Sequence, residues 1–312
     1  MPGYMALHKS AAWLDISPRG RIRAVGEDRL RLLHAIASNP VEGLQAGQGT
    51  YAFFLNAQGR IQADSRIFVC KDHVLIDCEP EVRQALLEHI ESYIIMDDVQ
   101  LEDLAESTAA LALEGPRSEE IARQAFDGPW PDPVPRSHRE SNGLHILRST
   151  LSGQAGLWFV CPPSRKRQLV EKLEAAGAEP ASEDDFRVVR VENRVPRFGE
   201  DYSSSNIPHE TGLLQAVSFT KGCYLGQEIV ERVRSQGQVN KLLISLELNT
   251  REPPPTGTAV QYDDREVGRL SSPVFSPRLK KVMAFAILRR EATEPGAKVA
   301  AAGVSGRVLA VG

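Results

Sequence analysis

The chain has 312 residues, and 42% of them are hydrophobic, so two or three domains with buried cores are expected. Its 37 Lys and Arg residues are balanced by 41 Asp and Glu residues, for a formal charge of −4. This balance excludes a sequence-wide basic surface, so we expect no nucleic-acid partner. No apolar run is long enough to cross a bilayer and the N-terminus lacks a secretory signal, so we expect no membrane partner.

The cysteines indicate a reducing compartment. There are four, Cys70, Cys78, Cys161 and Cys223. They are too few for a disulfide framework in so long a chain, and they form no CxxC pair or zinc motif. We therefore expect a cytoplasmic protein without a bound metal. A matrix protein whose presequence had been removed would have the same composition.

The first third of the chain predicts an antiparallel α+β unit. Residues 21–28 alternate apolar and basic side chains like a strand, and a helix with Asp28 as its N-cap follows. Residues 49–70 predict a hairpin with Gly59 in its turn, and strand and helix patterns continue after it. No dinucleotide-binding GxGxxG follows a strand and no phosphate-binding P-loop occurs, which argues against a Rossmann domain.

The middle of the chain repeats the strand and helix pattern and then becomes polar. Ser182 begins a helix, because Asp185 three residues later forms a sequence that resembles a capping box. Residues 194–213 have few apolar anchors, and a segment of this length without strong structure is often functional. Residues 213–219 predict one more strand.

The chain changes character near residue 240. Short alternating strands follow, broken by turns rich in Pro, Gly and Asp. This pattern predicts a small antiparallel barrel or Greek-key domain. We therefore divide the chain into an α+β module, residues 1–239, and a C-terminal β-barrel domain, residues 240–312.

The sequence FTKGCYLGQEIVERV, residues 219–233, places Cys223 before a predicted helix and close to Lys221. The helix N-terminus and the lysine favour a thiolate, and Gly222 and Gly226 permit a tight bend or the close approach of a ligand. Most free cysteines are small buried hydrophobes, however, and no base or complete metal site lies nearby. Local chemistry alone leaves the role of Cys223 open.

KGCYLGQE resembles the signature K-G-C-[FY]-x-G-Q-E of the YgfZ family of folate-binding proteins, which is related to the glycine cleavage T-protein. Residues 19–34, 49–68, 188–213 and 266–277 are similar to further segments of that family, in the same order. The resemblance implies two intertwined ferredoxin-like α+β lobes followed by an antiparallel β-barrel. These three lobes would form a ring around a channel that binds tetrahydrofolate. It also implies a role in assembling or repairing iron–sulfur proteins, which would be its partners.

The resemblance implies roles for individual residues. Glu192 corresponds to the T-protein glutamate of the R-L-E-A-G pattern, and a carboxylate suits the paired N–H donors of a pterin. Tyr224 would stack on the ring, and Arg232 and Arg234 would bind the anionic folate tail. Each also has an ordinary structural explanation: a solvated carboxylate, a core aromatic and two solvated arginines.

T-proteins carry adjacent aspartates after the hairpin glycine, and one of them serves aminomethyl transfer. This chain has Ala63 followed by Asp64. T-proteins also lack the KGCYLGQE cysteine. These differences favour the YgfZ-like branch over a standard aminomethyltransferase.

Three functions follow as hypotheses. The first is a tetrahydrofolate-binding accessory protein for iron–sulfur proteins that requires Cys223 and Lys221. The second is a tetrahydrofolate-dependent aminomethyl transferase, with Asp64 as base or electrostatic partner. The third is a non-catalytic interaction protein that has lost its folate pocket.

Overall fold

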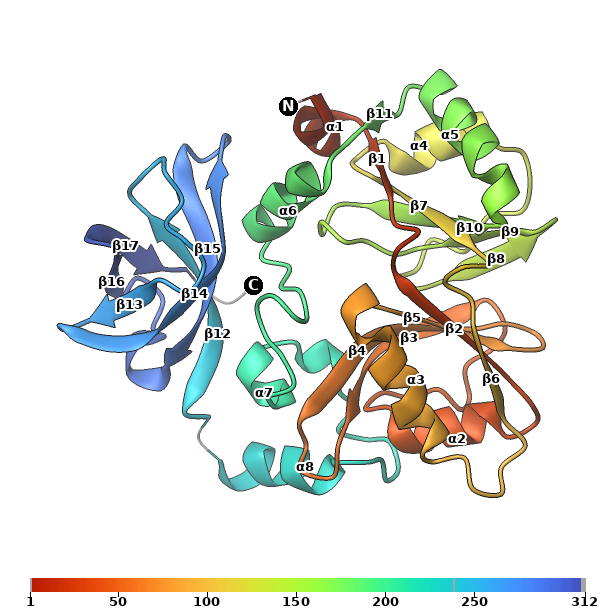
Figure 1. Cartoon of the computed structure of the whole chain (residues 1–312), viewed down its shortest axis with the longest axis horizontal. Coiled ribbons are helices and arrows are strands. Elements are labelled where there is room, and N and C mark those ends of the chain that lie inside the picture. The colour runs from red at the N-terminus through yellow and green to blue at the C-terminus, as the bar shows by residue number, and fades with distance from the viewer. Residues whose placement is uncertain (1, 238, 310–312) are drawn as a thin grey trace.

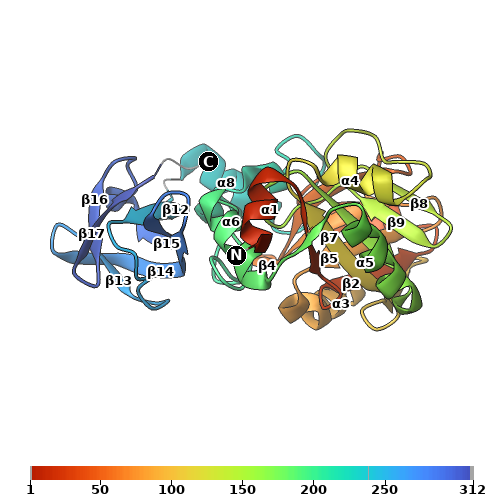
Figure 2. The ribbon, with the colours of Figure 1, turned by 90° about the horizontal axis from the view of Figure 1, so that it is seen from above.

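The computed structural model describes residues 2–237 and 239–309. Two α+β lobes and a barrel surround the centre of the molecule (Figure 1). Seen from above, helices α1 (Pro2–Lys9), α6 (Glu183–Glu192) and α8 (Gln227–Gln236) lie between the barrel and the α+β lobes (Figure 2). No helix in the described part of the chain is long and apolar enough to span a bilayer.

The first lobe is an antiparallel sheet with the strand order β3-β4-β5-β2-β6. Its strands are β2 (Gly20–Val25), β3 (Gln48–Leu55), β4 (Ile61–Val69), β5 (Val74–Cys78) and β6 (Gln100–Asp103). Helix α2 (Arg29–Ile36) follows β2, and α3 (Arg83–Glu91) follows β5. This is a ferredoxin-like arrangement with β3 as an extra edge strand.

The second lobe has the strand order β11-β1-β7-β10-β9-β8. Its strands are β1 (Ala12–Asp15), β7 (Ala109–Glu114), β8 (His138–Ser141), β9 (Leu144–Leu147), β10 (Gly156–Cys161) and β11 (Glu179–Pro180). Its helices are α4 (Ser118–Ala125) and α5 (Lys166–Ala175). Strand β1 precedes the first lobe in the sequence, yet it pairs with β7 of the second lobe. The two lobes are therefore intertwined.

The third lobe is a closed barrel of six antiparallel strands, closed because β12 pairs with both β15 and β17. The strands are β12 (Lys241–Leu248), β13 (Ala259–Tyr262), β14 (Arg265–Ser276), β15 (Lys281–Arg289), β16 (Lys298–Ala301) and β17 (Val304–Val308). Closure removes exposed strand edges. The predicted α+β class with a C-terminal antiparallel barrel is confirmed.

The segment between the second lobe and the barrel is mostly helical. The predicted capping box is present, since the Ser182 side chain accepts from the Asp185 N–H and Asp185 accepts in return. The predicted strand at residues 213–219 is wrong. A 3₁₀ turn, Leu214–Ala216, occupies it after the short helix α7 (Pro208–Thr211). This segment makes isolated hydrogen bonds to Ser38, one through the Ser38 carbonyl and one through its hydroxyl. It forms no ladder of backbone hydrogen bonds, so it is not a strand.

A buried charge network joins α6 to the barrel. The Asp201 carboxylate accepts from the Ser271 and Ser272 hydroxyls at 2.8 and 2.5 Å and from Arg190 at 2.7 Å. A bulge in β14 between Ser271 and Val274, with Ser272 at φ 49°, turns both hydroxyls toward Asp201. The barrel is therefore docked by directional bonds to a carboxylate that is only 4% exposed.

We expect Asp201→Ala to lower the free energy of unfolding by about 1–3 kcal/mol, because it removes one of the two carboxylate partners of buried Arg190 and the acceptor of two serine hydroxyls. Chemical denaturation measures this. The control is Glu171→Ala, which removes an exposed ion pair with Arg167 at 3.1 Å and should cost less than about 0.5 kcal/mol. Equal effects of the two substitutions would contradict a structural role for the network.

Candidate functional site

A cavity of about 530 Å³ lies between the two α+β lobes and α6. Its walls come from β1 and the turn after it, the β3–β4–β5 sheet, the loop of residues 148–151, and α6 with the loop that follows. None of the described lining residues belongs to the barrel. The volume is within the range of small-molecule sites, roughly 300–1,000 Å³.

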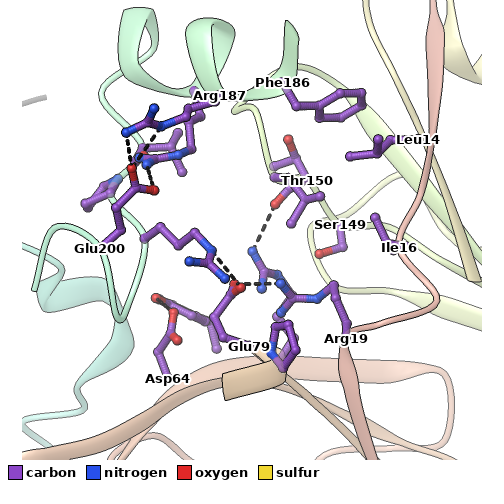
Figure 3. Close-up of a pocket in the computed structure, with 18 of the residues that line it drawn as sticks. Leu14, Ile16, Arg19, Asp64, Glu79, Ser149, Thr150, Phe186, Arg187 and Glu200 are labelled. Carbon is purple, nitrogen blue, oxygen red and sulfur yellow. Dashed lines mark hydrogen bonds and ion pairs between the residues drawn. The ribbon is translucent and has the colours of Figure 1, made fainter. Parts of the chain in front are cut away.

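The cavity has one apolar side and one charged side. Figure 3 shows Leu14, Ile16 and Phe186 on the first and Asp64, Glu79 and Glu200 on the second. Phe186 reaches the cavity because it shares a helix face with other lining residues spaced by three or four positions along α6: Glu183, Arg187 and Arg190. A few charged groups facing an apolar wall are typical of a site that holds a flat, polar-edged ligand.

Asp64 is the buried carboxylate of this site. It lies on β4 opposite Phe53 of β3 and is 7% exposed. Its Oδ2 accepts from the Tyr51 hydroxyl at 2.6 Å, and the Tyr202 hydroxyl lies 3.4 Å from that of Tyr51. Burial, with the nearby charge of Glu79, raises the pKa of Asp64 above its ordinary value. A carboxylate with a raised pKa is a stronger base than an ordinary aspartate, which suits it to accept a proton.

Glu79 is a second buried carboxylate, and its pKa is shifted in the opposite direction from that of Asp64. Burial opposes its ionisation, but Arg19 and Arg197 outweigh that effect and lower the pKa of Glu79 to about 2. Arg19 donates to its Oε1 at 2.6 Å and Arg197 to its Oε2 at 2.9 Å. The cavity therefore contains one carboxylate that stays ionised and one whose protonation can change, a division typical of acid–base sites.

Two arginines give the cavity a place for an anion. Arg66 and Arg136 both lie over the Tyr51 ring, each 5.9 Å from its centroid. Burial and the neighbouring charge of Arg66 lower the pKa of Arg136. Within residues 2–237 and 239–309, no carboxylate lies within 4.0 Å of the Arg136 guanidinium. A ligand carboxylate would relieve the repulsion between these two cations.

A third buried carboxylate, Glu114, holds the loop that forms one wall of the cavity. It accepts from the backbone N–H groups of Leu151 and Ser152 at 2.6 and 2.9 Å and from the Thr150 hydroxyl at 2.8 Å. Thr150 and Leu151 line the cavity, so Glu114 sets the path of the loop that forms this wall. It is fully buried and is a positioning residue.

The cysteine loop lies outside the cavity. Cys223 is exposed and stands three residues before Gly226, the N-cap of α8. None of the predicted loop residues, Lys221, Gly222, Cys223, Tyr224 and Gly226, is among the described residues that line the cavity. The loop packs instead against α2 and the hairpin turn of the first lobe.

Lys221 anchors this loop. Its ammonium donates to the carbonyls of His34, Ala37 and Asn39, at 2.7 Å for Ala37 and 3.4 Å for Asn39. These carbonyls lie at and after the C-terminus of α2, where a cation is stabilised by the helix dipole. Burial lowers the pKa of Lys221 to about 8, and the ammonium lies 5.0 Å from the Tyr224 ring centroid.

The two glycines of the loop differ. Gly226 has φ 80°, and a Cβ there would lie 2.6 Å from the Asn56 carbonyl oxygen, so a side chain is excluded on both counts. Gly222 has open space around it and no such constraint. Tyr224 is buried and packs in the main core rather than facing a ligand cavity.

The remaining predicted ligand residues lie apart from the cavity. Glu192 is buried where α6 meets α1 and the barrel, with Oε1 accepting from the Tyr4 hydroxyl at 2.8 Å and also from Ser276. His8 lies 2.9 Å from its Oε2. Arg232 is exposed on α8, and Arg234 stacks 4.7 Å from the Phe219 ring. The structure thus separates Asp64 from every other predicted site residue.

Sequence reasoning identified Asp64 and missed its neighbours. Arg66 is two residues further along β4 and therefore on the same face, a signal that the strand pattern contained. Glu79, Arg136 and Arg197 come from the end of a strand and from two loops, and no local pattern connects them.

The raised pKa of Asp64 makes a testable contribution to stability. A carboxyl whose native pKa exceeds its unfolded value of about 3.9 stabilises the fold fully below that value. This contribution is lost as pH rises through the native pKa. We therefore expect wild-type stability to fall relative to Asp64→Asn as pH rises from about 4. Urea denaturation of both proteins across this range measures the difference, and parallel profiles would contradict it.

Residues 3–221 match the GCVT N-terminal domain family, and residues 241–311 match the glycine cleavage T-protein C-terminal barrel domain. A putative chloroplastic transferase of Arabidopsis thaliana is 28% identical over 83% of this chain, which spans 61% of that protein. The aminomethyltransferase of Halalkalibacterium halodurans is 26% identical over 94% of this chain and 83% of its own length. The crystal structure of glycine cleavage system aminomethyltransferase T from Bartonella henselae superposes with a TM-score of 0.90 at 20% identity, covering 99% of this chain and 88% of that one. The chain therefore belongs to the glycine cleavage T-protein family.

Proposed function

We propose that this protein binds a tetrahydrofolate in the central cavity and transfers a one-carbon unit there, with Asp64 as the proton acceptor. The observation that carries the proposal is a buried carboxyl group with a raised pKa in the wall of a 530 Å³ cavity, in a chain of the T-protein family. Several relatives bear the name aminomethyltransferase, which makes the aminomethyl group the first substrate to test.

The cavity residues fit a folate in two respects. The apolar side formed by Leu14, Ile16 and Phe186 suits the faces of a flat ring. Arg136, which lacks a carboxylate partner among the described residues, and its neighbour Arg66 suit the carboxylates of the folate tail. Arg232 and Arg234, expected to bind this tail, lie on α8 outside the cavity, so the tail is assigned to Arg66 and Arg136 instead.

Asp64 has a clear task in such a reaction. Each amine nitrogen of a tetrahydrofolate loses its proton as it bonds to the one-carbon unit, and the amine or thiolate that leaves this carbon takes up a proton as its own bond breaks. Asp64 can take a proton at Oδ1, while its Oδ2 remains held by the Tyr51 hydroxyl. Burial raises the basicity of the Asp64 carboxylate, and Glu79 remains ionised beside Arg19 and Arg197 to balance their charge.

We expect Asp64→Asn to reduce turnover by about 10²–10⁴-fold and to leave tetrahydrofolate affinity within a few-fold of wild type. Calorimetry with tetrahydrofolate measures binding, and tetrahydrofolate consumption with a lipoyl-linked or free aminomethyl donor measures turnover. The matched control is Asp184→Asn, an exposed aspartate of α6 outside the cavity. Binding without turnover by the wild type would remove the transferase assignment, and absence of binding would remove the folate as well.

A second candidate function rests on the cysteine loop. The resemblance of KGCYLGQE to the YgfZ family points to the upkeep of iron–sulfur proteins, and the exposure of Cys223 leaves its thiol accessible to a client. Beneath the loop, polar atoms of Tyr224, His209 and Glu231 are buried without a hydrogen-bond partner among the described residues. Unpaired buried groups are few in native structures, so each of these is a place where a partner could supply the missing hydrogen bond.

This second function is tested separately because Cys223 lies outside the cavity. We expect Cys223→Ala to lower the activity of iron–sulfur enzymes in a strain that lacks the wild-type protein, with tetrahydrofolate affinity unchanged. Cys70→Ala or Cys78→Ala would not serve as controls, since both thiols are buried in the core. Wild-type levels of iron–sulfur enzyme activity with Cys223→Ala would exclude a required role for this thiol.

A further inference from the structure

Three side chains that commonly bind metals meet at the junction of the two α+β lobes, outside the central cavity. Cys70 follows β4 in the first lobe, and His138 and His145 lie on β8 and β9 of the second lobe. The Cys70 sulfur and one nitrogen of each imidazole all lie within 4.8 Å of one another. All three residues are buried, with exposures of 5–7%.

The His138 ring is held in the way that metal-binding histidines usually are. His138 Nε2 donates to the Val69 carbonyl at 2.9 Å, which leaves His138 Nδ1 with a free electron pair. That Nδ1 faces His145 Nε2 at 2.7 Å. A backbone carbonyl that holds the far nitrogen of a histidine is the usual outer contact of a ligating imidazole.

Metal binding sets the protonation states that these ligands need. The two imidazoles would bind as neutral rings and Cys70 as a thiolate. Burial, with the charges of Glu140 and Asp72, raises the pKa of the Cys70 thiol to about 12. Metal binding would therefore release one proton from Cys70.

Cys70 also belongs to a second group of three, in which Cys70, His73 in the turn before β5 and Glu140 on β8 have ligand atoms within 4.8 Å of one another. Either His73 or Glu140 would have to move toward His138 and His145 to share an ion with them. Both are more exposed than the three buried residues. Thiolate, imidazole and carboxylate are all ligand types that tetrahedral Zn²⁺ accepts.

We propose that Cys70, His138 and His145 bind a zinc ion, with His73 or Glu140 as the fourth ligand. To bind one ion at 2.0–2.1 Å, the facing nitrogens must separate from 2.7 Å to about 3.3 Å, a change that small ring rotations provide. A simple hydrogen bond between the two imidazoles is the alternative, and it leaves the position of Cys70 beside them unexplained.

Such an ion would join the two lobes far from the barrel. Cys70 and His73 belong to the β4–β5 turn, and His138, Glu140 and His145 belong to the β8–β9 hairpin. His138 and His145 are separated by more than 60 residues from Cys70, so no short sequence motif indicates the three buried ligands. None of the five residues is among the described residues of the central cavity, so the ion would have a structural role distinct from the proposed transfer reaction.

The first experiment uses the full wild-type chain without a metal-binding tag, purified with a reductant and without chelator. We expect about one zinc per chain by elemental analysis after gel filtration. Replacing zinc with Co²⁺ should produce a thiolate-to-cobalt charge-transfer band. Adding zinc to the metal-free protein should raise the thermal midpoint, because the ion binds only the folded site. No bound zinc and no effect of Zn²⁺ or Co²⁺ would overturn the proposal.

Variants then assign the ligands. Cys70→Ser and His145→Gln should lose stoichiometric zinc and the charge-transfer band. Cys161→Ser, an equally conservative change at a buried cysteine of β10, should keep both. Of His73→Gln and Glu140→Gln, the one that removes the fourth ligand should weaken zinc binding at least ~10-fold. Stoichiometric zinc in both Cys70→Ser and His145→Gln would refute the assignment.

Discussion

The position of α6 depends on the buried carboxylate of Asp201. Through Arg190, Ser271 and Ser272 this carboxylate joins the helix to the bulged strand of the barrel. The same helix forms one wall of the cavity, and Arg190 is one of the residues of that wall. Because a buried ion pair is tolerated only with good geometry and further hydrogen bonds, this junction allows little variation in where the helix lies. The barrel contributes no described residue to the cavity, yet it determines where Phe186 and Arg187 stand in it.

Within the cavity, environment rather than residue type distinguishes the two carboxylates. Glu79 lies between two guanidinium groups and stays ionised, whereas Asp64 has a tyrosine hydroxyl as its nearest partner and an anion close by. The same desolvation acts on both, so the difference comes from the charges of Arg19 and Arg197. This division supports proton transfer at Asp64 and explains why one aspartate is enough for the proposed chemistry.

Three features of the molecule lie in separate places. The cavity lies between the lobes, the cysteine loop lies against α2, and the cluster of Cys70, His138 and His145 lies where the hairpins of the two lobes meet. The lysine and the second glycine of KGCYLGQE have structural reasons, since one anchors the loop to α2 and the other fits against the hairpin turn. Cys223 is exposed, so its thiol is open to a partner.

Local pattern was enough to predict the α+β lobes, the capping box at Ser182 and the barrel, because alternation, capping and turn residues act over a few positions. Asp64 was selected by resemblance to the T-protein aspartates that follow the hairpin glycine, because its strand also contains Gln62, Ser65 and Arg66 and so does not single it out. Only the tertiary structure could show that Glu192 bonds to Tyr4 and Ser276 at a domain junction, or that Arg136 faces the same cavity as Asp64. The physical reason is that these partners are far apart in the sequence. The pairing of β1 with β7 and the packing of α6 on the barrel bring them together, and such long-range contacts leave no periodic pattern in the sequence.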